Sequence, residues 1–446
     1  MRDVVLLIIV SLATLATLRR PLIGVLTYAF LSVFSPQSFT WGFARTLPFS
    51  QLIVVSTILG IFISGDRKAF IFGREISLLV LLWIAFGVST LAALYPESAF
   101  ERYLYVSKVF FMLLVSTIVV NSEEKLHSLV CVIGYSLGLY ALKAGLFSVV
   151  TGGSQTVYGP DSNFLAANNS IGLALAMNIP VLIYLLRKEQ KPWRKWLLRT
   201  MLLLTYPAII CTYSRGAWIG MVIVTLLSVL KSKKKFVMVT AAGLVVVMLQ
   251  AILPKISPER LLNRYDELVN YEDEASAQSR FWNWEFCARV GMARPLTGGG
   301  FDFYTIESYA KFYPEFQERW PGKVWSCHSM FLTVFGEHGA VGAAIWLALL
   351  VSVMLRLRSL RWYGRQNRKQ SLIDFVDMAQ GALVAYLVVG VFLDAAYFEI
   401  FYYLIAFVII QHALISSALL VDRAAFARGQ LNGNLTIKSQ EQLVHS

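Results

Sequence analysis

Hydrophobic runs recur along the whole 446-residue chain, and most are about 15–25 residues long, the length that crosses the hydrocarbon core of a bilayer. Hydrophobic residues make up 57% of the sequence and charged residues only 15%, more apolar side chain than a soluble domain can bury beneath a polar surface. We therefore predict an all-α polytopic integral membrane protein with about twelve transmembrane helices. The runs cover residues 4–18, 21–35, 49–64, 75–94, 101–120, 126–150, 169–186, 196–213, 216–230, 236–253, 328–355, 375–394 and 398–421.

Basic residues, which give the chain a formal net charge of +13, gather in short clusters between these runs. The clusters at 66–74, 187–199, 231–235 and 356–369 fall in alternate loops, which the positive-inside rule places in the cytoplasm. This pattern favours a membrane protein over a nucleic-acid-binding protein. The first run lacks a small-residue cleavage site, so we expect no cleaved signal peptide.

The remaining loops then face the periplasm of a bacterial inner membrane, and the longest of them is 254–327. Within it the sequence predicts an amphipathic helix at 279–292, capped by Ser276 or Ser279. Its aromatic residues suit the depth of lipid headgroups. These are Phe281, Trp282, Trp284 and Phe286. The three glycines at 298–300 indicate a turn rather than a phosphate-binding loop, because no P-loop pattern surrounds them.

This topology divides the chain into four parts. We expect transmembrane helices in 1–253, a large periplasmic loop in 254–327, further transmembrane helices in 328–421 and a cytoplasmic tail in 422–446. The shorter predicted outer loops are 36–48, 95–100, 151–168, 212–216 and 395–397.

Four of the arginines in predicted outer segments are candidates for binding an anionic ligand. Arg215 occupies a turn too short to let it move freely, although an arginine that extends to headgroups is an equal alternative. Arg280 lies near the start of the 279–292 helix, where the helix dipole disfavours a cation unless an anion is close. Arg289 and Arg294 are weaker candidates of the same kind, and solvated loop charges remain the alternative.

His328 lies at the predicted outer start of a membrane helix, where water and a lipid-borne substrate can both reach an imidazole. A single histidine is more often a structural hydrogen-bonding residue, and that alternative stays open. His338 is ten residues further, roughly 15 Å along a regular helix, and Glu337 faces the opposite side. We expect both to be buried partners of other helices, while Gly339 and Gly342 allow close helix approach.

Carboxylates and cysteines near the outer turns are secondary candidates. Asp394 and Glu399 flank one short turn and Asp161 lies in another, so each could orient His328 or an acceptor, or could be a solvated charge. Cys287 and Cys327 share the predicted oxidising side, so a disulfide between them is an open alternative, although without geometry we do not expect one.

Two arginines and an imidazole on one face suggest a division of labour. Guanidinium groups bind phosphate bidentately and stabilise charge on a phosphate leaving group. A neutral imidazole can take the proton of an attacking hydroxyl near neutral pH. Because no outer carboxylate cluster has metal-ligand spacing, we predict a mechanism without a metal or another cofactor.

His328, Ser329, Gly339 and Gly342 reproduce the spacing His-[Asn/Ser/Gln]-x9-Gly-x2-Gly, which resembles the signature of bacterial O-antigen ligases. Related polymerases and protein O-oligosaccharyltransferases share parts of it.

Other segments extend this likeness. Residues 214–216 resemble the family's periplasmic arginine turn, and 280–284 and 295–301 resemble its Arg-x3-Trp and Pro-Leu-x-Gly-x-Gly segments, with the glycines slightly off the usual spacing. Residues 20–21 and 41–43 also resemble ligase-like proteins associated with exosortase systems.

The resemblance implies an inverting glycosyltransferase of GT-C-like architecture that needs neither metal nor nucleotide. Its donor would be a polysaccharide on undecaprenyl pyrophosphate, and its acceptor a sugar hydroxyl of lipid A–core. Carried over, Arg215 and Arg280 would hold the pyrophosphate and His328 would be the general base.

Two sets of alternatives remain. A protein O-oligosaccharyltransferase or an O-antigen polymerase would use the same donor with another acceptor. A polytopic transporter of lipid or sugar would place charged residues at mid-membrane depth and interrupt paired helices, and only Lys143 and Asn178 hint at that.

Overall fold

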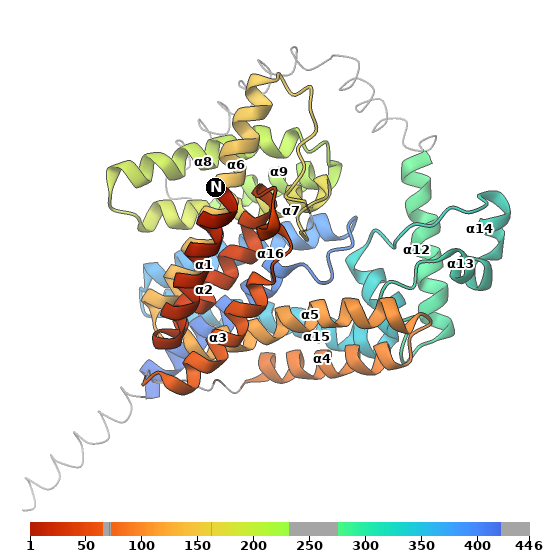
Figure 1. Cartoon of the computed structure of the whole chain (residues 1–446), viewed down its shortest axis with the longest axis horizontal. Coiled ribbons are helices and arrows are strands. Elements are labelled where there is room, and N and C mark those ends of the chain that lie inside the picture. Colours follow the sequence, from red (N-terminus) through yellow and green to blue (C-terminus); the bar gives the residue numbers. More distant parts are fainter. Residues whose placement is uncertain (66–70, 72, 162, 232–274, 421–446) are drawn as a thin grey trace, which may run out of the picture.

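The computed structural model describes residues 1–65, 71, 73–161, 163–231 and 275–420, and every regular element in these ranges is helical (Figure 1). The elements are α1 Arg2–Arg19, α2 Pro21–Val33, η1 Pro36–Phe39, η2 Phe43–Arg45, α3 Phe49–Ile63, α4 Arg74–Leu91, α5 Pro96–Val119, α6 Glu123–Val150, α7 Asn168–Lys188, α8 Pro192–Ile210, α9 Arg215–Lys231, α12 Ala275–Ala293, α13 Ile306–Phe312, α14 Pro314–Arg319, α15 Met330–Gln366, α16 Gln370–Gly390 and a last helix, Glu399–Leu420.

The helices reproduce the hydrophobic runs. Every predicted run within the described residues forms a helix, whereas the run at 236–253 and the predicted tail at 422–446 lie outside them. Seven of the described helices are long and apolar enough to cross a membrane, and α2 and α3 are shorter apolar helices. The chain is thus a multi-pass membrane protein by length and composition of its helices, but the predicted number of about twelve crossings is not confirmed.

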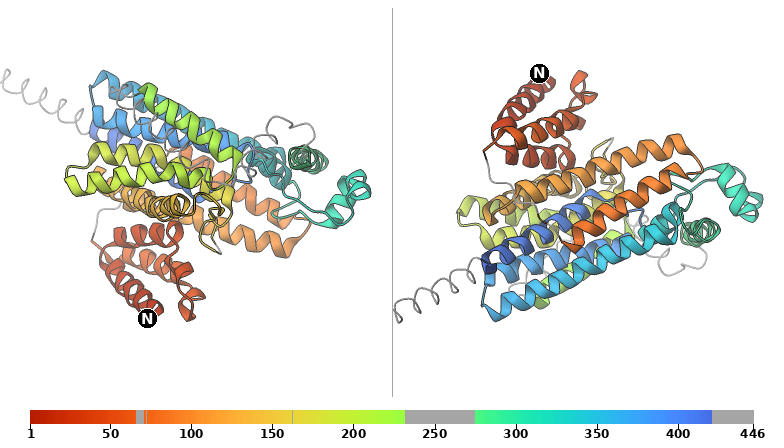
Figure 2. Two further views of the ribbon diagram at one scale, coloured as in Figure 1. Left: turned by 90° about the horizontal axis from the view of Figure 1, so that it is seen from above. Right: turned by 90° about the horizontal axis from the view of Figure 1, so that it is seen from below.

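The first three helices form a small lobe of their own, which stands beside the main bundle in both views of Figure 2. Helices α1 and α3 approach each other so closely that a Cβ at Gly60 would collide with the Thr17 carbonyl. Asp3 accepts hydrogen bonds from the backbone N–H groups of Gly42 and Ala44, 3.1 Å each. The start of the chain therefore lies with the predicted outer loop 36–48.

The main bundle has apolar faces turned both inward and outward. Helix α7 is the most enclosed candidate span, with 78% of its apolar window buried, so it forms the centre. On α15, by contrast, Val341, Leu347, Val351 and Leu355 are exposed. Exposed apolar side chains on a long helix suit contact with lipid.

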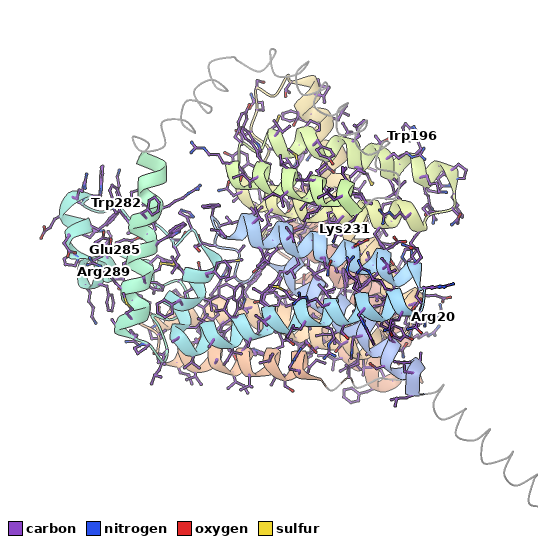
Figure 3. The ribbon with its side chains drawn as sticks, turned by 180° about the vertical axis from the view of Figure 1, so that it is seen from behind. Arg20, Trp196, Lys231, Trp282, Glu285 and Arg289 are labelled. Atoms are coloured by element: carbon purple, nitrogen blue, oxygen red, sulfur yellow. A yellow bond between two sulfur atoms is a disulfide. The ribbon has the colours of Figure 1, made fainter. Side chains whose placement is uncertain are left out.

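The described parts of the predicted basic loops lie together at one end of the molecule (Figure 3). Arg20, Trp196 and Lys231 mark this end, and Trp282, Glu285 and Arg289 mark the opposite end (Figure 3). Ion pairs at the basic end tie α7, α9 and α15 to acids on α16 and α4. They are Arg187–Asp374 at 2.9 Å, Lys231–Asp377 at 3.5 Å and Arg356–Glu75 at 2.8 Å. The charge pattern thus predicted which loops share an end, while the side of the membrane stays a prediction.

Helices α12, α13 and α14 form a second lobe at the opposite end (Figure 1). Its core is largely aromatic: Phe286 stacks on Tyr309 with centroids 3.6 Å apart, and both side chains are fully buried. A disulfide joins Cys287 on α12 to Cys327 within this core, so our expectation that these cysteines stay unpaired is wrong. A sequence separation of 40 residues says nothing about distance, and the fold brings the two Cα atoms to 5.9 Å.

The structure corrects two further details of this lobe. Helix α12 begins at Ala275, before the predicted start, so positions 276 and 279 lie inside the helix and not at its N-cap. Of the aromatic residues expected at headgroup depth, Phe286 is buried and Trp282 packs 5.8 Å from Trp320, whereas Phe281 is 49% exposed. Aromatic packing within the lobe therefore takes most of the apolar surface that was predicted to face lipid.

Helix α15 is kinked at Gly339, whose φ of 66° and ψ of −169° are not helical. The glycine run 298–300 repairs the interrupted ladder of hydrogen bonds. Gly299 and Gly300 donate to the carbonyls of Gly336 and Glu337 at 2.8 and 2.9 Å, and Ala340 donates to the Pro295 carbonyl at 2.7 Å. The three glycines are thus a docking segment for the kink, because a Cβ at Gly298 would overlap the α15 backbone.

Candidate active site

The sequence predicted His328 in the first turn of a membrane helix. In the structure it lies two residues before α15 begins. Its φ of 50° is left-handed, a conformation that histidine adopts more readily than most residues. Disulfide-bonded Cys327 precedes it and Ser329, the N-cap residue of α15, follows it, so both sides of the turn are fixed. The imidazole is 38% exposed and can meet a substrate.

Asp394 is the partner of this imidazole. His328 Nδ1 lies 3.3 Å from Asp394 Oδ2. Ser326 Oγ donates to Oδ2 at 2.5 Å and Thr333 Oγ1 donates to Oδ1 at 2.8 Å. Burial opposes ionisation of this carboxyl, but the contacts from His328, Ser326 and Thr333 outweigh it and hold the pKa of Asp394 below its usual value. An ionised carboxylate beside Nδ1 leaves Nε2 as the nitrogen available to a substrate.

Residues 389–394, which run from the last turn of α16 to Asp394, lie near both Arg280 and the start of the helix that carries Arg215. The Arg280 guanidinium lies 5.7 Å from the Phe392 ring centroid, within cation–π range. Arg215 begins α9, and its neighbour Gly216 packs on Val389, where a Cβ would be 3.6 Å from Cγ1.

The same segment also contacts the helix that follows His328. Gly390 has no room for a Cβ against the Met330 sulfur, two residues from His328. Residues 389–394 therefore contact Arg280, His328 and Gly216, the residue next to Arg215.

The other predicted cations have structural partners. Arg289 pairs with Glu285 at 2.7 Å and Glu315 at 3.1 Å, which holds α12 to α14. Arg294 donates to the carbonyls of Gly298 and Ala92. Both arginines stabilise the second lobe and its junction with α4.

Asp161 and Glu399, the remaining acidic candidates, have partners other than His328. Asp161 pairs with Arg45 at 3.4 Å on the surface. Glu399 accepts hydrogen bonds from Tyr105 at 2.6 Å and from Ser32, so it links the first lobe to the last helix.

Glu337 and His338 are buried and bonded to other elements, as the helix spacing predicted. Tyr397 donates to Glu337 Oε2 at 2.5 Å and lies 2.6 Å from His338 Nε2. His338 Nδ1 is 2.8 Å from Ser89 Oγ on α4. This network ties the α15 kink to the turn that carries Asp394.

A cavity of about 560 Å³ opens beside Asp394, a size in the ordinary range for ligand pockets. Its walls come from α2 and η1, the start of α3, the first half of α5, the loop before α7 with Ser170, and the turn at 394–399. It also holds Arg102 and Lys108 of α5, which the sequence analysis overlooked. Two cations within the otherwise apolar run 101–120 were the available signal.

Two known protein families match parts of the chain. Residues 200–347 match the family described as O-antigen ligase, and residues 1–190 match a family of unknown function (DUF5935). No curated protein matches the chain. Arg215, Arg280 and His328 all fall within the first match, whereas Asp394 follows it. The resemblance read from the motifs is confirmed by this match to the O-antigen ligase family over residues 200–347.

Proposed function

We propose that the protein is a metal-independent, inverting glycosyltransferase that moves a polysaccharide from undecaprenyl pyrophosphate to a sugar hydroxyl of lipid A–core. The observation that carries the proposal is the His328–Asp394 pair, whose carboxylate lines a polar cavity and whose imidazole lies within the residues that match the O-antigen ligase family. The predicted GT-C-like architecture and the four-part division of the chain belong to the same proposal.

The pair supplies the proton chemistry. Asp394 holds Nδ1–H of His328, so Nε2 takes the proton of the acceptor hydroxyl as its oxygen attacks the anomeric carbon. The bond from that carbon to the phosphate oxygen breaks, and undecaprenyl pyrophosphate leaves with the electron pair. A single displacement inverts the anomeric configuration.

The arginines supply the charge that the leaving group needs. Arg280 faces Phe392 and Arg215 begins α9, so both flank the 389–394 segment that ends in the orienting carboxylate. Guanidinium groups there would hold the pyrophosphate bidentately and stabilise the charge that develops on it.

The disulfide supports a periplasmic site in a bacterial inner membrane. Disulfides persist in oxidising compartments, and Cys327 is the residue before His328. Lys231 and the basic segment around Trp196 lie at the opposite end of the molecule, as expected for a cytoplasmic face (Figure 3).

The test is transfer by purified protein given lipid-linked glycan and lipid A–core, with EDTA and without nucleotide. His328→Asn is the informative variant, because asparagine also accepts a left-handed conformation and only the base is lost. We expect its rate to fall roughly 10²- to 10⁴-fold. His127→Asn, a histidine of α6 packed near Tyr184, is the matched control and should retain activity.

Full activity of His328→Asn would refute the base assignment. Transfer only to a second lipid-linked glycan, or only to a protein, would identify a polymerase or a protein O-oligosaccharyltransferase instead.

A further inference from the structure

The cavity beside Asp394 contains cations that the proposed chemistry does not use. Arg102 and Lys108, both on α5, line it, so one helix contributes two cations to the cavity wall. Arg215 and Arg280 are not among its lining residues. The molecule thus has a second basic site, separate from the arginines assigned to the pyrophosphate.

Neither of these two cations makes a close ion pair with a described acid. Within the described ranges, no carboxylate oxygen comes within 4.0 Å of either side-chain nitrogen group. Arg102 packs against the Tyr105 ring at 5.1 Å. The two carboxylates of the cavity are already engaged, Glu399 by Tyr105 and Ser32 and Asp394 by His328. Cationic groups facing a cavity in this way favour an anionic ligand.

Uncharged polar side chains cover much of the remaining wall. Among the described residues, the side chains of Gln37, Ser50, Gln51 and Ser170 line the cavity without a hydrogen bond to protein. The Gln37 Oε1 atom is buried and has no donor in that part of the chain. Amide and hydroxyl groups without partners match the hydroxyls of a sugar.

We propose that this cavity is the acceptor subsite and that it takes a sugar bearing an anionic group, a phosphate or a carboxylate. Arg102 and Lys108 bind the anion, the amides and hydroxyls bind the ring, and one hydroxyl reaches His328 past Asp394. The role as acceptor subsite rests on the proposed function, whereas binding of an anionic sugar does not.

Electrostatics argues against the donor pyrophosphate as occupant. A multiply charged pyrophosphate would face the carboxylates of Asp394 and Glu399 within the same walls, whereas a sugar places one charge at α5 and neutral hydroxyls elsewhere. The two arginines assigned to the pyrophosphate, Arg215 and Arg280, do not line this cavity.

Binding is measured first, by saturation-transfer NMR on protein in lipid nanodiscs. The probes are methyl glucuronide, glucose 6-phosphate and, as the neutral match, methyl glucoside. We expect at least one anionic probe to bind and Arg102→Gln or Lys108→Gln to weaken it about tenfold or more, since each loses a charge-assisted hydrogen bond. Lys311→Gln, which alters an exposed cation of α13, should change nothing.

Three outcomes overturn the inference. The neutral probe could bind as well as the anionic ones, or no sugar probe could bind. Alternatively, inorganic pyrophosphate could be the probe whose affinity depends on Arg102, in which case the cavity serves the donor.

Kinetics then separates this inference from the proposed function. With an anionic acceptor, Arg102→Gln should raise the acceptor KM about tenfold and leave the donor KM and kcat unchanged. A rise in the donor KM instead would overturn the acceptor assignment. If wild-type protein transfers no glycan but keeps the charge-dependent sugar binding, the proposed function fails while the anionic-sugar site stands.

Discussion

Removal of the Cys287–Cys327 disulfide tests how the second lobe holds His328. The bond closes a loop of 40 residues, from α12 to the residue before His328. In the chain-entropy description, a loop of this size corresponds to about 13 cal/mol/K, or about 4 kcal/mol at 25 °C, and measured effects are commonly 2–4 kcal/mol. At 1.4 kcal/mol per factor of ten, opening of the lobe should become roughly 30- to 1,000-fold more frequent.

Hydrogen exchange followed by mass spectrometry measures this opening directly. Peptides over Phe286 and Tyr309, both fully buried in the lobe, should exchange faster in the Cys287→Ala/Cys327→Ala variant, and peptides of α7 should not change. Cys131→Ala, which removes a free cysteine and keeps the disulfide, is the control. Transfer activity should fall with lobe protection, because the left-handed turn at His328 loses its covalent anchor.

The argument fails if lobe peptides of the double variant exchange within about threefold of wild type. The aromatic core would then hold the lobe without the covalent bond. Wild-type transfer activity in a lobe that does open faster would show that the Ser329 cap and Asp394 suffice to place the imidazole.

Three further perturbations test the site and its supports. Asp394→Asn should lower kcat about 10²-fold or more through loss of His328 orientation. Because the pKa of Asp394 is lowered by folding, its stabilisation is present above about pH 4 and is lost as the pH falls through the folded value. The difference in melting temperature between wild type and Asp394→Asn should therefore shrink between pH 6 and pH 3, and a constant difference contradicts the assignment. Arg280→Lys should raise the donor KM about tenfold, unlike Arg289→Lys, since only Arg280 is assigned to the pyrophosphate. Gly339→Ala meets both a φ of +66° and the Pro295 carbonyl 2.5 Å from its Cβ, so it should destabilise more than Gly322→Ala, which meets only a φ of +73° in open space, and equal losses in thermal unfolding would contradict the clash.

Hydropathy and charge predicted the helices because a long apolar run is stable in a bilayer only as a helix, whatever the rest of the chain does. All predicted runs within the described residues are helical. The number of crossings did not follow, since α8 carries Arg194, Lys195 and Arg199 within its length and falls short of an uninterrupted apolar window. Local composition therefore identifies a helix more securely than a membrane crossing.

The site was partly predictable because its leading residues break the apolar pattern. His328 and its possible partner Asp394 were found from their positions, and the structure brings them to 3.3 Å. Long-range pairing could not be found this way. The disulfide and the docking of residues 298–300 on the α15 kink depend on contacts between distant segments, which a single sequence does not encode locally. Arg102 and Lys108 were visible as cations in an apolar run but carried no family motif.

The division between matched families suggests how chemistry and acceptor choice are separated. Arg215, Arg280 and His328 lie in residues 200–347, which match the O-antigen ligase family. The cavity cations, by contrast, lie in residues 1–190, a family of unknown function, and the two parts meet at Asp394, outside both matches. Asp394 touches His328 on one side and lines the cavity on the other, so it couples the two. On the proposed mechanism, substitutions in the cavity wall should change which acceptor is used without changing how the donor bond breaks, because the groups at that bond belong to the other part of the chain.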